Sequence, residues 1–86
     1  MKLEESEKIV LKILKSLVKN IKNINLDSKL QDDLGMDSIK LISLAVELAQ
    51  KTNVDMLEIS EKVDFSKIIT VRDVVIFFHE IKAKQL

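Results

Sequence analysis

The chain has 86 residues with 14 basic and 14 acidic side chains, so its formal charge is zero, and 47% of its residues are hydrophobic. A neutral chain with 3% aromatic residues lacks the basic surface that binds phosphate backbones and the rings that stack on unpaired bases, which argues against a nucleic-acid partner. Because cysteine is absent and histidine occurs once, disulfides, cysteine nucleophiles and cysteine or multi-histidine metal sites are excluded.

The length predicts one domain over residues 1–86, and the composition predicts an all-α fold. Proline is absent and glycine occurs once, while leucine, isoleucine, lysine and glutamate are frequent. No apolar run approaches the ~20 residues that a membrane span needs, and the acidic N-terminal segment lacks the apolar stretch of a signal peptide. We therefore expect a cytoplasmic monomer without a membrane partner.

A first amphipathic helix is predicted from Leu3 to Ile21. Its apolar face consists of Leu3, Val10, Ile13, Leu14, Leu17, Val18 and Ile21. The opposite side carries Lys8, Lys12, Lys15, Lys19 and Lys22. We interpret these lysines as a solvated face, with a membrane-binding or calmodulin-like surface as the alternative.

A long polar connection is predicted between this helix and the next, ending at Met36. Four apolar residues are expected to pin it to the core: Ile24, Leu26, Leu30 and Leu34. Long ordered loops tend to be functional, so residues 32–38 are expected to occupy a defined place.

A second helix is predicted from Ser38 to Lys51, with an apolar arc that is wider than one core contact requires. The arc consists of Ile39, Leu41, Ile42, Leu44, Ala45, Val46, Leu48 and Ala49. Such a helix is central in a bundle, or it offers an apolar edge to a partner, or both.

Residues 54–69 are predicted to be irregular with one or two short helical turns, anchored by Val63, Phe65 and Ile68. Thr70 and Asp73 form a capping-box pattern that predicts a last helix from Val71 to Lys84. Its inward face is predicted to carry Val71, Val74, Val75, Phe78 and Ile81.

The junction before the second helix holds the candidate site. Gly35 permits a positive φ or the close approach of another molecule. Ser38 falls in the first turn of a helix, where free amide groups and the helix dipole favour an attached phosphate. The alternative is that Asp37 and Ser38 only cap the helix. Met36 either contacts a partner or packs within the loop.

Residues 32–39 read DDLGMDSI, which resembles the D-x-L-G-x-D-S-[LI] attachment motif of acyl carrier proteins. The resemblance spans nearly the whole chain and includes the leading helix, the long loop and the apolar helix that begins at the serine. Residues 64–71 look like the family's short third helix and its I-x-T-V entry to the last helix. The resemblance implies a small acyl-carrier-like bundle of three main helices plus a short third helix.

What the resemblance implies is a non-catalytic carrier rather than an enzyme. A Mg-dependent phosphopantetheinyl transferase would attach 4′-phosphopantetheine from coenzyme A to Ser38, and the thiol of that arm would hold acyl or aminoacyl groups as thioesters. The absence of cysteine agrees, since no thiol of the chain competes for the cargo. Asp37 matches the family's acidic residue that contributes to transferase recognition, and Gly35 and Met36 complete the candidate cofactor-binding residues.

Within the family, the second helix differs from that of fatty-acid carriers, because Glu47 is its only acidic residue past Asp37. The chain also lacks the Gly-His-Ser triplet of peptidyl carriers. We therefore expect a stand-alone carrier for loading and downstream enzymes of a polyketide or nonribosomal-peptide-like pathway. The alternatives are a housekeeping fatty-acid carrier, a discrete aminoacyl or peptidyl carrier, and an unmodified helical interaction module.

The edge of the second helix beside Ser38 is the expected docking surface. Ile39 and Val46 lie about 20° apart on a helical wheel. Burial of a branched apolar side chain contributes roughly 1.5–3 kcal/mol, whereas an exposed ion pair gives about 0–1 kcal/mol. We expect docking to depend on apolar contacts more than on carboxylates. The candidate docking residues are Ile39, Lys40, Ser43, Val46 and Glu47.

Overall fold

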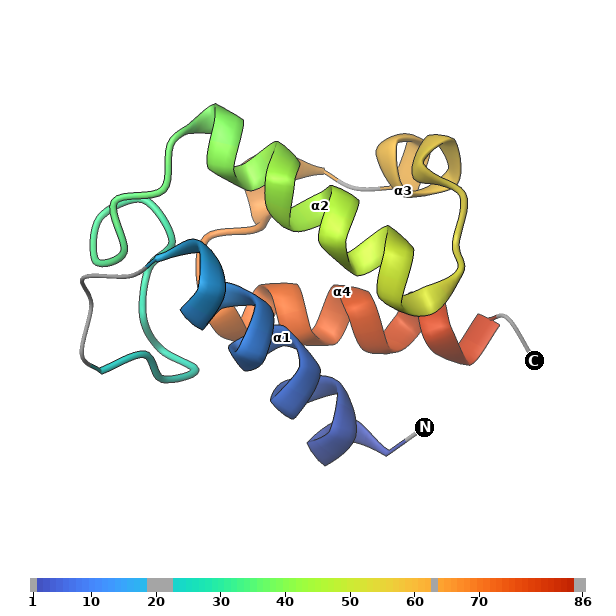
Figure 1. Ribbon diagram of the computed structural model, residues 1–86, viewed down its shortest axis with the longest axis horizontal. Helices are drawn as coiled ribbons and strands as arrows, with labels where there is room; N and C mark the ends of the chain where they lie inside the picture. The colour runs from blue at the N-terminus through green and yellow to red at the C-terminus, as the bar shows by residue number, and fades with distance from the viewer. Residues whose placement is uncertain (1, 19–22, 63, 85–86) are drawn as a thin grey trace.

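The computed structural model describes residues 2–18, 23–62 and 64–84. In these residues the chain forms the elements drawn in Figure 1, which are α1 (Leu3–Leu17), α2 (Ser38–Thr52), α3 (Met56–Lys62), the 3-10 turn η1 (Phe65–Lys67) and α4 (Val71–Lys84). The described part of the chain has no strand beyond one isolated antiparallel bridge, between Lys29 and Thr70. The prediction of an all-α bundle with three main helices, a short third helix and a long first loop is confirmed.

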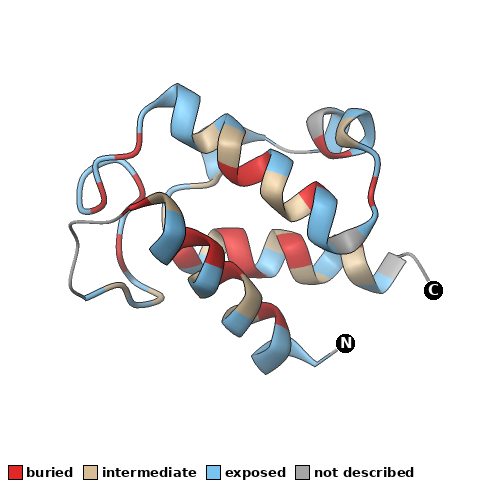
Figure 2. Ribbon diagram, viewed as in Figure 1, coloured by how far each residue is buried: buried red, intermediate tan, exposed pale blue. Residues whose placement is uncertain are grey.

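The main apolar core lies between α1, α2 and α4. α1 packs against both α2 and α4, and α3 packs against α2. Buried residues also occur along the long first loop, as Figure 2 shows. The core consists of Val10, Ile13, Leu14, Val18, Leu30, Leu34, Met36, Leu44, Val71, Val74, Val75 and Phe78. The inward face predicted for α4 is confirmed, because all five of its residues are buried.

The buried face of α1 begins at Ser6, one turn later than predicted. Leu3 is 52% exposed, because a side chain in the first turn points toward the N-terminal end of the helix and away from the packed turns. Ser6 is fully buried, and its Oγ lies 3.1 Å from Nδ1 of His79 on α4. The first and last helices, α1 and α4, are thus joined by a polar contact as well as by the core.

The C-terminal end of α1 also differs from the prediction, since the helix ends at Leu17. Val18 has a non-helical backbone with φ −118° and ψ 85°, and its side chain still reaches the core from there. The Nζ of Lys40 on α2 donates to the carbonyl of Leu17 at 3.4 Å, which satisfies one of the carbonyls that a helix end leaves free. The predicted end at Ile21 and the residues Lys19 and Lys22 lie outside the described residues.

α2 ends one residue later than predicted. Asn53 follows it in the left-handed region, with φ 56°, and its N–H donates to the carbonyl of Ala49. Asparagine is the residue that takes this position most readily after glycine, because its short polar side chain tolerates a positive φ.

The segment after α2 is anchored by one predicted residue, Ile68, and by two residues that were not predicted. Val54 and Ile59 are buried, at 6% and 5% exposure, and they hold α3 against α2 and α4. Ile68 is half-buried and packs against the main core, as predicted. Val63 and the side chain of Phe65 lie outside the described residues. The two short helical pieces in this segment match the expectation of one or two helical turns.

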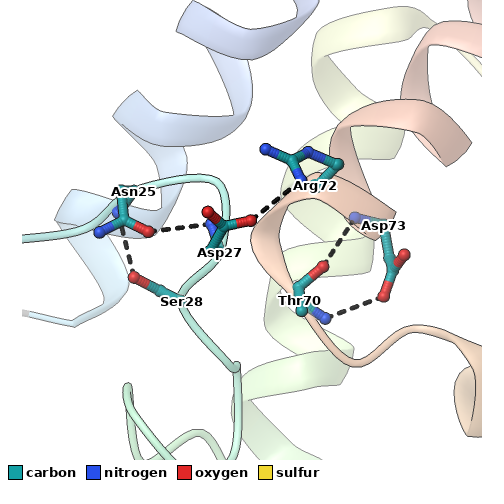
Figure 3. Close-up of polar contacts among 6 residues, drawn as sticks. All are labelled: Asn25, Asp27, Ser28, Thr70, Arg72 and Asp73. Atoms are coloured by element: carbon teal, nitrogen blue, oxygen red, sulfur yellow. Dashed lines mark hydrogen bonds and ion pairs between the residues drawn. The ribbon is translucent and has the colours of Figure 1, made fainter.

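The predicted capping box at the start of α4 is confirmed. The N–H of Thr70 donates to Oδ2 of Asp73 at 2.9 Å, and the N–H of Asp73 donates to Oγ1 of Thr70 at 3.3 Å (Figure 3). The same Asp73 oxygen accepts from the N–H of Ile69 at 3.0 Å. The bonds from the Thr70 and Ile69 amides lower the pKa of the Asp73 carboxyl from its ordinary value. The carboxylate form therefore stabilises the fold.

Replacement of Asp73 tests this cap. We expect Asp73→Ala to lower the free energy of unfolding at pH 7 by about 0.5–2 kcal/mol, the usual effect of losing a helix cap. Since the folded pKa lies below the unfolded one, the unfolded state binds protons first, and wild type loses this contribution only as the pH falls below about 4. Urea unfolding at pH 7 and pH 3 measures both effects.

The matched control is Glu80→Ala, which removes an exposed carboxylate from the same helix. It is expected to unfold like wild type at pH 7. The role assigned to Asp73 is wrong if Asp73→Ala keeps the full wild-type dependence of stability on acid pH.

Candidate functional site

Three backbone hydrogen bonds fasten the long first loop to the segment that enters α4. The N–H of Leu30 donates to the carbonyl of Ile69 at 2.9 Å, that of Val71 to Ser28 at 3.0 Å, and that of Arg72 to Leu26 at 2.9 Å. We call this pairing of residues 26–30 with residues 69–72 the latch. It joins parts of the chain about 40 positions apart and fixes the path of the loop that leads to Ser38.

Side chains around the latch support it, as Figure 3 shows. Asn25 closes a polar turn, because its Oδ1 accepts from the N–H of Asp27 at 2.9 Å and its own N–H donates to Oγ of Ser28 at 3.0 Å. Asp27 also pairs with Arg72 at 2.9 Å. Both partners of that ion pair are more than half exposed, so it stabilises the latch by only about 0–1 kcal/mol. The backbone hydrogen bonds and the turn at Asn25 contribute more to the stability of the latch.

After the latch, the loop packs three of its apolar side chains into the core. Leu30, Leu34 and Met36 are each less than 5% exposed, and the N–H of Met36 donates to the carbonyl of Leu30 at 2.9 Å. Met36 therefore packs within the core, which favours the loop-packing alternative. Its side chain is not offered to the arm or to a partner enzyme, so Met36 is removed from the candidate cofactor-binding residues.

Gly35 makes the turn that leads from the loop into α2. Its φ is +64°, a conformation that glycine adopts without the penalty of a side chain. A Cβ at this position would have no atom within 4 Å, so the backbone conformation and not crowding requires glycine here. The positive-φ interpretation of Gly35 is thus confirmed.

Asp37 caps α2 and leaves Ser38 at its exposed first position. Oδ1 of Asp37 accepts from the N–H of Lys40 at 2.9 Å, and the backbone carbonyl of Asp37 accepts from Leu41 at 3.0 Å. Among the described residues, no acceptor is paired with the N–H of Ser38 or Ile39. A phosphate on the Ser38 hydroxyl would meet free amide donors and the positive end of the helix dipole, so this site fits a phosphoester.

A surface hollow of about 280 Å³ lies beside Ser38. Its other lining residues are Gln31 from the loop and Leu41 and Ile42 from α2. Ile42 belongs to the apolar arc predicted for this helix but not to the predicted site residues, and Gln31 had no predicted role. Helical spacing could have found Ile42, four residues after Ser38, whereas the position of Gln31 depends on how the latch folds the loop back.

The predicted docking residues separate into two groups on α2. Ile39 is 74% exposed and Val46 is 37% exposed, and Ile42, at 55%, completes a row that we call the apolar stripe. Glu47 is half-buried and lines a hollow between α1 and α2 that also holds Lys12.

Two further candidate residues are occupied by contacts within the protein. The Nζ of Lys40 reaches the end of α1, at the carbonyl of Leu17. Ser43 turns its hydroxyl back to the carbonyl of Ile39 at 3.1 Å. The structure therefore brings Ile39 and Val46 together on an open face and places Lys40 and Glu47 on the side toward α1.

Comparison with known families agrees with the geometry. A family model described as the phosphopantetheine attachment site matches residues 8–77. The chain belongs to this family. It is a non-catalytic carrier of the acyl carrier protein type. Its cofactor is covalently attached 4′-phosphopantetheine. Carriers of this kind work with a phosphopantetheinyl transferase and biosynthetic enzymes.

Three negative findings accompany this match. No curated protein matches the chain. None of the helices in the described ranges is long and apolar enough to cross a membrane. Residues 2–18, 23–62 and 64–84 contain no group of three or more acidic, histidine or cysteine side chains placed to hold a metal ion.

Proposed function

We propose that Ser38 is the attachment site and that residues 1–86 form one carrier domain. The observation that carries this proposal is the exposed Ser38 hydroxyl at the capped start of α2, inside the stretch that the family model matches. The cargo would be acyl or aminoacyl groups held as thioesters, passed between enzymes of a polyketide or nonribosomal-peptide-like pathway.

The attachment step needs little from the carrier beyond an accessible hydroxyl. The Ser38 oxygen forms a bond to the phosphorus next to the pantetheine of coenzyme A, the phosphoanhydride bond breaks, and adenosine 3′,5′-bisphosphate leaves. The hydroxyl proton passes to the transferase. The chain contributes the free N–H groups of Ser38 and Ile39, which favour the phosphoester. It also contributes Asp37, whose exposed carboxylate is the proposed contact for the transferase.

In this chain the arm would carry the only thiol. The sequence has no cysteine, so no thiol of the chain can take the acyl group by thioester exchange. The single histidine, His79, contacts Ser6 on α1 and lies on α4 rather than at the start of α2.

Replacement of the proposed attachment residue tests the assignment. Incubation with coenzyme A and a broad-specificity phosphopantetheinyl transferase is expected to add one phosphopantetheine to wild type. Ser38→Ala is expected to gain no mass, because the accepting oxygen is gone, and to keep the wild-type far-UV circular dichroism. Intact-protein mass spectrometry measures the outcome.

Ser66→Ala is the matched control and is expected to be modified like wild type. Modification of Ser38→Ala, or loss of modification in the control, would show that the arm is carried elsewhere. An unmodified wild type would favour the helical interaction module.

The apolar stripe is the proposed docking surface for enzymes that load or receive the cargo. Ile39, Ile42 and Val46 are exposed beside Ser38, where an enzyme that takes up the arm must approach. The acidic residue of this helix, Glu47, is half-buried on the side toward α1. A partner with its own apolar patch is therefore favoured over one with a basic surface, which supports a specialised carrier rather than the carboxylate-rich fatty-acid type.

A charge placed in the stripe is expected to impair docking. Val46→Asp should weaken binding to the cognate loading enzyme by about tenfold or more, the equivalent of ~1.5 kcal/mol for one buried branched side chain. Folding should persist because Val46 is exposed. Affinity and loading rate, measured across a salt series, test this expectation.

Glu47→Gln is the control that removes the carboxylate without changing the shape of the side chain. It should bind nearly as well as wild type, and salt should weaken docking only modestly. A steep fall in affinity with salt, or a larger loss from Glu47→Gln than from Val46→Asp, would reject docking through the apolar stripe.

A further inference from the structure

The hollow beside Ser38 has a composition that matches the arm. We propose that the arm rests on the protein surface in this hollow, with its two methyl groups against Leu41 and Ile42 and one of its amides hydrogen-bonded to the Gln31 carboxamide. This inference rests on attachment at Ser38. It assigns to Gln31 the role of a positioning residue.

Ser38 itself lines the hollow, so the first atoms of an arm attached there would already lie in it. Leu41 and Ile42 lie three and four residues after Ser38, so they follow it on the same side of α2. Gln31 faces them from the loop. The volume of about 280 Å³ accommodates a chain of small groups lying across the surface.

Gln31 has unused hydrogen-bonding capacity. Its backbone carbonyl accepts from the N–H of Gly35 at 3.1 Å, but within the described ranges its exposed carboxamide has no partner. A carboxamide offers both donors and an acceptor, which is the set that an amide of the arm needs. The order of groups also agrees, since pantetheine has its methyl-bearing carbon one CH2 group away from the phosphoester oxygen and its amides farther along.

The apolar hollow between α2 and α4 is a poorer place for the arm. This hollow, lined by residues that include Leu44, Leu48 and Phe77, has only about 40 Å³, and its lining is almost entirely apolar. Amides buried there would lose their hydrogen bonds to water without replacement, which is costly. By contrast, Gln31 also lines a second surface hollow of about 200 Å³, with Asp32 and Ser66, so the far end of the arm has a polar path across the surface.

A docked arm covers part of the apolar stripe, because Ile42 belongs to both. An enzyme that binds the stripe therefore displaces the arm from Ile42. Arm release and partner docking are coupled through this one side chain.

Nuclear magnetic resonance of the holo protein tests the inference. With isotope-labelled pantetheine on Ser38, we expect cross-relaxation between the arm's methyl groups and the methyls of Leu41 and Ile42, and between an arm amide and the Gln31 side-chain amide. In Gln31→Ala the ratio of docked to free arm should fall about threefold, as expected for loss of one neutral hydrogen bond. Weaker cross-relaxation to Leu41 and Ile42 reports that change.

Gln50→Ala is the matched control, since Gln50 is an exposed glutamine of α2 outside the hollow. It should leave the signals unchanged. Intact mass is recorded for every sample, so failure of attachment at Ser38 is recognised separately. If the mass shows full modification but the cross-relaxation is absent, or unchanged in Gln31→Ala, the proposed position of the arm is wrong.

Discussion

The pairing of the first loop with the entry to α4 is the constraint on which the rest of the site depends. Leu30, Val71 and Arg72 each donate a backbone hydrogen bond across the latch, and Leu30 and Val71 are almost fully buried there. Each bond has a net value of about 0.5–1.5 kcal/mol, but a buried amide left without its partner costs more, about 1–3 kcal/mol. The latch therefore forms as a unit, together with the turn at Asn25 and the capping box of Asp73.

The geometry at Ser38 follows from that constraint. With Leu30 fixed in the core, the loop turns at Gly35, which has a positive φ. The buried Met36 side chain then holds the loop against the core just before α2. α2 then begins at a defined point, capped by Asp37, with the Ser38 hydroxyl exposed. α1 and α3 pack against α2, and α2 shares the main core with α4. The apolar residues of α2 that these contacts leave uncovered remain on the outside as the apolar stripe. One helix thus carries Ser38, one side of the hollow and the apolar stripe.

Local signals were predictable from the sequence, and long-range placement was not. The Thr70–Asp73 cap and the motif around Ser38 depend on residues a few positions apart, so the sequence alone could predict them. The end of α1 at Leu17 was missed because the core accepts Val18 from a non-helical backbone. The burial of Met36 and the place of Gln31 depend on the latch between distant segments, which periodicity does not encode.

Hydrogen exchange of individual amides tests the latch most directly. Val71 and Arg72 are the first two residues of α4, and in an ordinary helix their N–H groups have no intrahelical partner and exchange quickly. We predict that these amides and that of Leu30 exchange as slowly as the buried turns of α4, while the amide of Gln31 in the same loop exchanges quickly. If Val71 and Arg72 exchange as quickly as Gln31, the latch does not hold the loop, and the account of how Ser38 is presented is contradicted.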